Sequence, residues 1–247
     1  MKIYILLIII PIAVSSCNKG KLDWELPRKN KLDSLCNENP IDANLPVAKF
    51  YTSIRSIEIG STVNFSSNSI KNPFTCIWSF PGGIPSSSLK TNENVVYQSI
   101  GKYPVSLKVE NNFGIDSILK KDYIEAYYFK SFSNADWGGW INNGWTFSNS
   151  GNILAWQNSS TTPISFTITR TFTNVSLNPK LDFFYNIYSP GGTLKVKVNN
   201  VEIWSSDGYS SNTVSIQLPS VSFINLKFEA LVGYTQSIYL NNIAIKP

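Results

Sequence analysis

The chain of 247 residues contains no histidine. This absence removes the commonest general base, the Ser-His-Asp and Cys-His arrangements of nucleophilic enzymes, and zinc sites ligated by histidine. Catalysis would have to rely on carboxylates, lysine or tyrosine. Charged residues are also scarce, at 15% of the chain, so the surface must depend on hydroxyl and amide side chains.

The positive charge is small and thinly spread. Lysine and arginine exceed aspartate and glutamate by only five, and no segment carries a basic run of the kind that follows a phosphate backbone. This pattern argues against nucleic acid as a partner. Methionine occurs once, whereas aromatic residues make up 13%, and serine, asparagine and threonine are frequent. That composition favours strands and turns over helices. We therefore expect an all-β protein.

Residues 1–16 have the character of a targeting segment. One lysine precedes an apolar run from Ile3 to Val14, which is too short to span a bilayer. The run ends Val14-Ser-Ser-Cys17, which resembles the lipobox of bacterial lipoproteins, here of the Bacteroidota type. The resemblance implies cleavage before Cys17, lipidation of that cysteine and attachment to the outer membrane, facing the periplasm or the cell surface. The alternative is an ordinary signal peptide with an incidental cysteine.

Residues 17–45 are expected to form a linker that carries the lipidated cysteine, because their apolar residues follow no period. Two further cysteines, Cys36 and Cys76, could pair in an oxidising compartment. Cys36 lies in the linker, however, and Cys76 is predicted to point into a core. We favour two separate thiols.

Residues 46–127 contain the most specific pattern in the chain. Trp78-Ser-Phe-Pro-Gly-Gly is followed by Gly101-Lys-Tyr103-Pro-Val-Ser-Leu-Lys-Val109, in which apolar and polar residues alternate. This spacing resembles a PKD (polycystic kidney disease) domain, which implies an immunoglobulin-like sandwich that acts as a spacer or interaction module. Expected strands cover residues 47–51, 62–66, 74–80, 95–97, 103–109 and 117–126.

Three features of this segment yield specific expectations. Trp78 is predicted to be the central core aromatic, with Cys76 and Phe80 on the same face. The Tyr103 hydroxyl is placed to bond back to the preceding backbone, as in a tyrosine corner. Pro104 lacks an N–H group, so it predicts an edge or a bulge.

Residues 128–247 are expected to form a second β-sandwich. Strands are predicted at 164–172, 181–185, 194–198, 201–204, 214–218, 224–231 and 237–245, and Asn199-Asn200 suits a type I′ hairpin turn. Their order resembles jelly-roll ectodomains of the MAM-like and cleaved-adhesin-like kind. Asn241 stands where those families usually have aspartate, which weakens the calcium site that the resemblance would imply. We expect neither a metal nor a cofactor.

Four aromatic residues are candidates for ligand binding. Trp137 and Trp140 lie among glycine and asparagine, where indole rings could stack on sugars. Trp204 and Tyr209 form a weaker second candidate. The alternative is that the tryptophans of this region pack in the core. We favour the core for Trp145, and for Trp137 and Trp140 we weigh a place in the core and a place in a ligand site equally.

The five carboxylates of residues 128–247 share no motif, so no catalytic residue is assigned. The sequence therefore predicts a non-catalytic cell-envelope lipoprotein that binds glycan or another extracellular polymer through residues 128–247. A structural or adhesive component that recognises envelope proteins is the alternative. A hydrolase that uses carboxylates is the least favoured reading.

Overall fold

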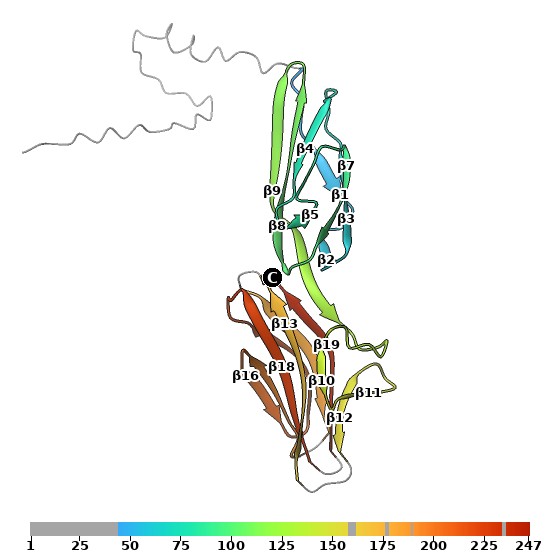
Figure 1. Cartoon of the computed structure of the whole chain (residues 1–247), viewed down its shortest axis with the longest axis vertical. Coiled ribbons are helices and arrows are strands. Elements are labelled where there is room, and N and C mark those ends of the chain that lie inside the picture. Colours follow the sequence, from blue (N-terminus) through green and yellow to red (C-terminus); the bar gives the residue numbers. More distant parts are fainter. Residues whose placement is uncertain (1–43, 158–161, 176–177, 189, 234–235) are drawn as a thin grey trace, which may run out of the picture. The chain divides into compact units, whose positions relative to one another are not determined.

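The computed structural model describes residues 44–157, 162–175, 178–188, 190–233 and 236–247 (Figure 1). These residues form nineteen strands and no helix, which confirms the all-β prediction. In the described part of the chain no helix is long and apolar enough to cross a membrane. The expected signal peptide, Cys17, Cys36 and the expected linker as far as residue 43 lie outside the described residues.

The N-terminal sandwich consists of two sheets. The strands are β1 (Phe50–Thr52), β2 (Ser56–Glu58), β3 (Thr62–Ser67), β4 (Thr75–Ser79), β5 (Gly83–Ile84), β6 (Ser87–Ser88), β7 (Asn92–Tyr97), β8 (Gly101–Asn111) and β9 (Gly114–Lys130). One sheet has the order β1-β3-β7-β5, and β6, β4, β8 and β9 follow one another in the other. Strand β2 joins the second sheet by pairing in parallel with β9.

Alternation along the strands directs apolar side chains between these two sheets. Trp78 and Phe80 are fully buried and stack with ring centroids 5.4 Å apart, and Cys76 is buried on the same face as a free thiol. Phe50 and Phe65 contact Trp78 from the opposite sheet. The expected central role of Trp78 is confirmed.

The two local expectations for strand β8 are also confirmed. The Tyr103 hydroxyl donates to the Ser99 carbonyl at 2.8 Å, which closes the predicted tyrosine corner. The pairing of β8 with β9 shifts register between Tyr103 and Val105. Pro104 lies at that shift, where the ladder does not need the N–H group that proline lacks.

The C-terminal sandwich packs two five-stranded sheets face to face. The strands are β10 (Ile141–Asn143), β11 (Thr146–Phe147), β12 (Ile153–Gln157), β13 (Ile164–Thr173), β14 (Lys180–Ile187), β15 (Thr193–Val198), β16 (Val201–Asp207), β17 (Ser210–Gln217), β18 (Phe223–Val232) and β19 (Gln236–Lys246). The first sheet has the order β10-β13-β18-β15-β16. In the second, β12 follows β11, and β19 lies between β12 and β14, with β17 beyond β14.

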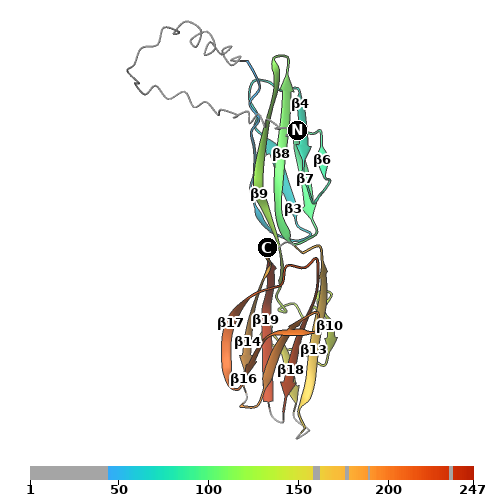
Figure 2. The ribbon, with the colours of Figure 1, turned by 90° about the vertical axis from the view of Figure 1, so that its left-hand side faces the viewer.

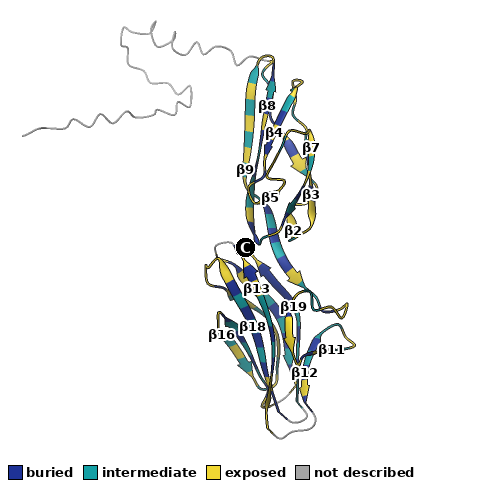
Figure 3. Ribbon diagram, viewed as in Figure 1, coloured by how far each residue is buried: buried dark blue, intermediate teal, exposed yellow. Residues whose placement is uncertain are grey.

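The core of the C-terminal sandwich follows from strict alternation in its long strands. Figure 3 shows this alternation along β18, where buried residues are separated by more exposed ones. On β14, Phe183 and Tyr185 point inward and Phe184 points outward. Asn199 and Asn200 both have positive φ angles, 51° and 67°, as the predicted hairpin turn requires.

Strand β9 takes part in both sandwiches. Its first part pairs with β8, and its last residues, Tyr128 to Lys130, pair with Ile243–Ile245 of β19. The domain boundary expected between residues 127 and 128 thus falls inside one continuous strand. Residues 44–247 form one compact unit that contains all the described strands and both hydrophobic cores. This part of the chain therefore has the burial it needs to fold by itself.

Candidate functional site

The Trp137 to Trp140 segment is a turn whose second tryptophan enters the core. Gly138 and Gly139 adopt positive φ angles of 54° and 81°, which lets the chain reverse sharply. Arg170, on the inward-facing side of β13, donates to the Gly138 carbonyl and lies over the Tyr128 ring at 4.6 Å, which holds the turn against the end of the core. The turn then directs the Trp140 side chain inward.

Trp140 is therefore not available to a ligand, which corrects its candidacy as a stacking residue. Its side chain is only 4% exposed, and its indole N–H donates to the Tyr128 hydroxyl at 2.7 Å. Trp145 is buried as well, as expected. Trp137 is half-buried against the core, and its ring lies 4.4 Å from that of Phe147.

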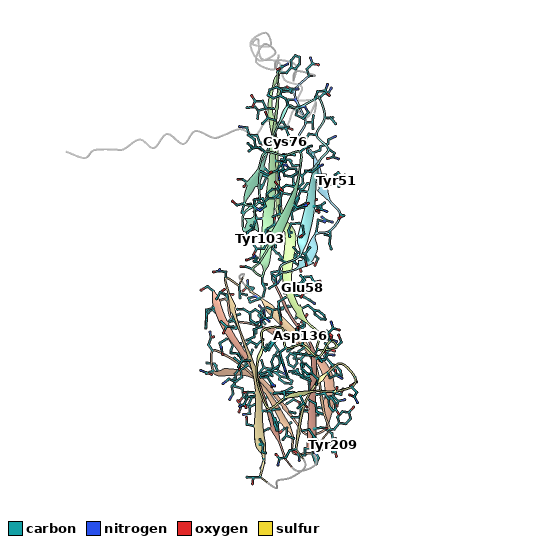
Figure 4. All side chains as sticks on the ribbon, turned by 45° about the vertical axis from the view of Figure 1, so that its right-hand side comes forward. Tyr51, Glu58, Cys76, Tyr103, Asp136 and Tyr209 are labelled. Atoms are coloured by element: carbon teal, nitrogen blue, oxygen red, sulfur yellow. The ribbon has the colours of Figure 1, made fainter. Side chains whose placement is uncertain are left out.

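The second pair of candidates is also divided by the structure. Trp204 is half-buried, with its ring packed at 5.2 Å from Phe183 and 5.1 Å from Tyr185. Tyr209 is 73% exposed in the turn before β17. Figure 4 shows Asp136, the neighbour of Trp137, and Tyr209 at opposite ends of the C-terminal sandwich. The four candidates do not form one site.

The structure instead brings exposed aromatic rings together on the outer face of β12, β19 and β14. Residues paired across neighbouring strands share a face of the sheet. We call this surface the aromatic face; its residues are Asn152, Trp156, Phe184, Asn186, Tyr188, Ser237 and Tyr239.

Strand register fixes the arrangement of these side chains. Tyr239 of β19 pairs with Leu154 of β12 on one side and with Asn186 of β14 on the other. In the next row Trp156 pairs with Ser237, whose carbonyl accepts the Tyr188 N–H at 3.0 Å. Trp156 and Tyr188 thus flank Ser237 from opposite sides, 51% and 56% exposed.

The aromatic face contains a hollow large enough for a small ligand. A cavity of about 470 Å³ is lined by residues from β14, the position after it, β19 and the turn before β12. Its lining residues are Ser150, Asn152, Phe184, Asn186, Tyr188, Ser237 and Tyr239. Three of these seven carry aromatic rings, and none is charged. Such a surface suits a ligand that is itself uncharged and has both apolar and hydroxylated sides.

Several polar groups in the hollow are available to a ligand. Within the described residues, the side-chain polar atoms of Asn186, Tyr188, Ser237 and Tyr239 make no hydrogen bond. The Asn152 amide donates only to the Ser150 hydroxyl, at 3.0 Å. Amide and hydroxyl groups can both donate and accept, which matches the hydroxyl groups of a sugar.

One end of the aromatic face is closed by an ion pair. Lys246 lies 2.8 Å from Asp182, the residue two positions before Phe184 on β14. Burial of the Asp182 carboxylate raises its pKa, but the hydrogen bonds from Lys246 and Ser215 outweigh this, and the pKa lies below its ordinary value. Asp182 is therefore an ionised, paired carboxylate near neutral pH and not a general acid.

The outer face of the opposite sheet has a different character. Lys197 pairs with Glu229 at 2.7 Å, and Lys195 pairs with Glu202 at 2.9 Å. Threonines of β13 occupy much of the remaining surface. Outward polar and charged side chains that alternate with buried apolar ones are typical of a sheet face in contact with solvent. The two outer faces of the same sandwich thus differ in chemistry: several rings gather on the aromatic face, whereas the opposite face has the exposed ring of Phe223 beside paired charges.

Four of the five described carboxylates of this sandwich are paired with lysines, and the fifth, Asp207, is exposed at the end of β16. Asp182, Glu202 and Glu229 are paired as described, and Asp136 pairs with Lys130 at 2.9 Å. Among the residues with assigned positions, no group of three or more cysteine, aspartate or glutamate side chains could hold a metal ion.

Trp156, the indole of the aromatic face, was not predicted to bind a ligand, because no strand was predicted over residues 153–157. Residues 153–157, Ile-Leu-Ala-Trp-Gln, are almost continuously apolar and therefore show no alternation. A signal was present nonetheless: a short apolar run between Gly151-Asn152 and Asn158-Ser-Ser, which is typical of a strand bounded by turns. Tyr209 was anticipated, and it lies beside this face. Ile187 pairs with Ser210, so Tyr209 follows next to Tyr188 at the end of the ladder.

Comparison with known proteins bears mainly on the fold. The model of the PKD domain family matches residues 48–117, less than half of the chain. No curated protein matches the chain by sequence. The protein thus consists of a PKD domain followed by a second, jelly-roll-like β-sandwich.

Solved structures similar to the chain include several carbohydrate-binding modules. One, from a study of promiscuous specificity in carbohydrate-binding modules of the beta-sandwich superfamily, is 17% identical; the match covers 80% of this chain and 96% of that chain, with a TM-score of 0.36. A mutant of a family 29 carbohydrate-binding module is 16% identical over 48% of this chain and 89% of that chain, with a TM-score of 0.35. A family two carbohydrate esterase from Cellvibrio japonicus is 9% identical over 49% of this chain and 33% of that chain, with a TM-score of 0.33. Likenesses this distant do not identify a ligand.

Proposed function

We propose that this protein is a non-catalytic glycan-binding protein whose C-terminal sandwich holds an uncharged polysaccharide on the aromatic face. The observation that carries the proposal is the cluster of Trp156, Tyr188 and Tyr239 around Ser237, beside an uncharged hollow that Ser237 and the two tyrosines line. An exposed ring can pack on the apolar side of a pyranose, and the neighbouring amide and hydroxyl groups can bond its hydroxyls.

The chemistry of the sandwich supports binding over turnover. Hydrolysis of a glycosidic bond ordinarily needs two carboxylates placed across it. Asp182 is held by Lys246 at the margin of the aromatic face, and the lining of the hollow contributes no acid. The chain also has no histidine to act as a base.

In this proposal the rest of the chain attaches the C-terminal sandwich to the membrane and holds it away from the membrane surface. Lipidation at Cys17 attaches the protein to the outer membrane, and the PKD domain acts as the spacer that carries the C-terminal sandwich. Continuity of β9 through both sandwiches supports the spacer role, because a shared strand couples them more firmly than a flexible linker would.

The proposal is tested with residues 44–247 on an array of neutral and charged polysaccharides, followed by affinity electrophoresis on the best ligand. Trp156→Ala should weaken retention at least tenfold, since loss of an aromatic anchor commonly costs about 2 kcal/mol. Phe113→Ala, which removes a similarly exposed ring from the PKD domain, is the matched control and should not change retention. The proposal fails if no neutral polysaccharide binds, or if Trp156→Ala binds as tightly as its parent.

A protein-binding envelope component is the second candidate. The PKD domain favours it, because its exposed apolar residues include Phe74, Phe113 and Leu119. Capture of a defined envelope protein that depends on Phe113, without any glycan binding, would favour this alternative.

A further inference from the structure

Strand β17 is an open edge of the sheet that carries the aromatic face. It pairs with β14 along all eight of its residues and with no other strand in the described part of the chain. Figure 2 shows β17 at the margin of the C-terminal sandwich, outside β14. A strand with one neighbour presents a row of unpaired backbone groups, to which a strand from another chain can bind.

Two hydrogen bonds show which backbone groups of β17 point outward. The Leu218 N–H donates to the Pro179 carbonyl on the β14 side, at 2.8 Å. The Thr213 N–H is instead bonded by the Asn212 side chain, at 2.8 Å. Backbone groups alternate in direction along a strand, so the odd-numbered residues direct theirs away from β14. These residues are Ser211, Thr213, Ser215 and Gln217.

This edge lacks the features that usually prevent strand pairing between molecules. Neither charge nor proline occurs from Gly208 to Leu218. Other long edges in the described chain are charged: β16 carries Glu202 and Asp207, and the open part of β9 carries Lys120 and Lys121. The remaining described edge strands have two or three residues each. Natural sheets protect long edges with charge, proline or shortness, and β17 has none of these.

We propose that two copies of this chain associate through β17, paired antiparallel about a twofold axis that passes beside Val214. This register places Ser211 opposite Gln217 and Thr213 opposite Ser215 of the second copy. All the outward-facing residues then find a partner, and the Thr213 N–H exchanges its bond to the Asn212 side chain for one to the second copy. Because every paired side chain is uncharged, the strand meets its own copy without repulsion, and small hydroxyl side chains suit directly opposed positions.

A second copy of β17 is a better partner than an unrelated strand, because pairing two copies joins the aromatic face of one chain to that of the other. A twofold axis perpendicular to the sheet sets residues of equal parity opposite each other, so the same face stays outward in both copies. Thr213 lies beside Phe184, and Ser211 lies beside Asn186. The two aromatic faces therefore become parts of one continuous sheet surface. If the proposed function holds, the dimer has two sites for a single polymer and gains avidity.

The test measures the mass of residues 44–247 by light scattering during size-exclusion chromatography over a hundredfold range of concentration. We expect twice the mass of one chain at the upper concentrations. Ser215→Pro should give the monomer mass with a nearly unchanged melting temperature, because the N–H group that it removes faces away from β14 and Asp182 keeps its bond to Lys246 when the Ser215 hydroxyl is lost. The double substitution Thr213→Lys/Ser215→Lys should also give monomers, by opposing like charges across the axis. Ser165→Lys, on the exposed outer face of the opposite sheet, is the matched control and should remain dimeric.

A parent that is monomeric at all concentrations would overturn the proposal, as would a dimer that persists in both β17 variants. Neither result depends on glycan binding. Where a glycan ligand is found, Ser215→Pro should bind a short oligosaccharide as its parent does but should be retained at least tenfold less on the polymer. Loss of binding to the oligosaccharide in Trp156→Ala, with the dimer mass unchanged, reports on the proposed function separately.

Discussion

The ring of Tyr188 meets the ring of Tyr239 edge to face, with centroids 5.4 Å apart and planes at 82°. Tyr188 directly follows β14 and Tyr239 lies in β19, and both line the hollow of the aromatic face. Edge-to-face contact favours a fixed arrangement of two rings. The pair therefore forms a preorganised corner in which one ring can stack on a sugar while the other bounds it, and less side-chain freedom is lost on binding.

The two hydroxyls of this corner provide the first prediction. In the described structure neither bonds to protein, so Tyr188→Phe and Tyr239→Phe should leave the melting temperature nearly unchanged. Each should weaken binding to the polysaccharide by about 0.5–1.5 kcal/mol, the usual contribution of one hydrogen bond. Isothermal titration on residues 44–247 measures this difference. Unaltered affinity in both variants would mean that the hydroxyls do not contact the ligand.

Trp140 provides a prediction of the opposite kind. Its buried ring packs near Phe172 and Phe228, and its N–H is bonded to Tyr128. Trp140→Ala should lower the free energy of unfolding by about 3–5 kcal/mol. Trp137→Ala should cost less, because that ring is half-buried. Chemical denaturation followed by circular dichroism compares the two. Equal stability of the two variants would contradict the placement of Trp140 in the core.

The difference between Trp137 and Trp140 shows where sequence reasoning reaches its limit. Strands such as β8 and β18 were predictable, because alternation over many residues depends only on which side is buried. Whether a ring in a glycine-rich turn is buried depends on the direction that the turn gives it. Here Arg170, 32 residues after Gly138 in the chain, holds that turn. No local pattern contains this contact.

The aromatic face was missed for a related reason. Its members come from β12, β14 and β19, so only tertiary pairing brings Trp156 and Tyr188 to opposite sides of Ser237. Each strand alone presents one or two outward rings, which is ordinary for a surface. Phe184 and Tyr239 appeared within predicted strands, yet their shared face could not be derived without the order of the strands.

The membrane anchor is a prediction that lies outside the described residues. Val14-Ser-Ser-Cys17 after a short apolar run is expected to direct lipidation. Cys17→Ala in the full chain should remove the acyl chains and shift the protein out of the membrane fraction. Mass spectrometry and fractionation of the producing bacterium measure both effects, and Cys36→Ala serves as the control. Membrane retention of Cys17→Ala at unchanged mass would reject the anchor.

The last prediction concerns a buried tyrosine of the PKD domain. Tyr97 is fully buried, and its hydroxyl has no hydrogen-bond partner among the described residues. A buried polar group without a partner costs free energy, so Tyr97→Phe should raise the stability of the domain by about 1 kcal/mol at pH 7. Its ring stacks on Tyr103 at 4.7 Å, and phenylalanine keeps that contact.

The same residue should make the domain sensitive to alkali. Burial, and secondarily the nearby Tyr103, raise the pKa of Tyr97 far above its ordinary value near 10. Above about pH 10 the unfolded chain therefore releases a proton that the folded chain retains, and stability falls by up to about 1.4 kcal/mol per pH unit for this group. The contribution is fully present below pH 10 and is lost as the pH rises. Urea unfolding between pH 8 and 12 should accordingly show a shallower decline in Tyr97→Phe than in the parent or in the exposed control Tyr51→Phe. If the three curves fall in parallel, the hydroxyl of Tyr97 ionises in the folded domain as easily as in the unfolded chain.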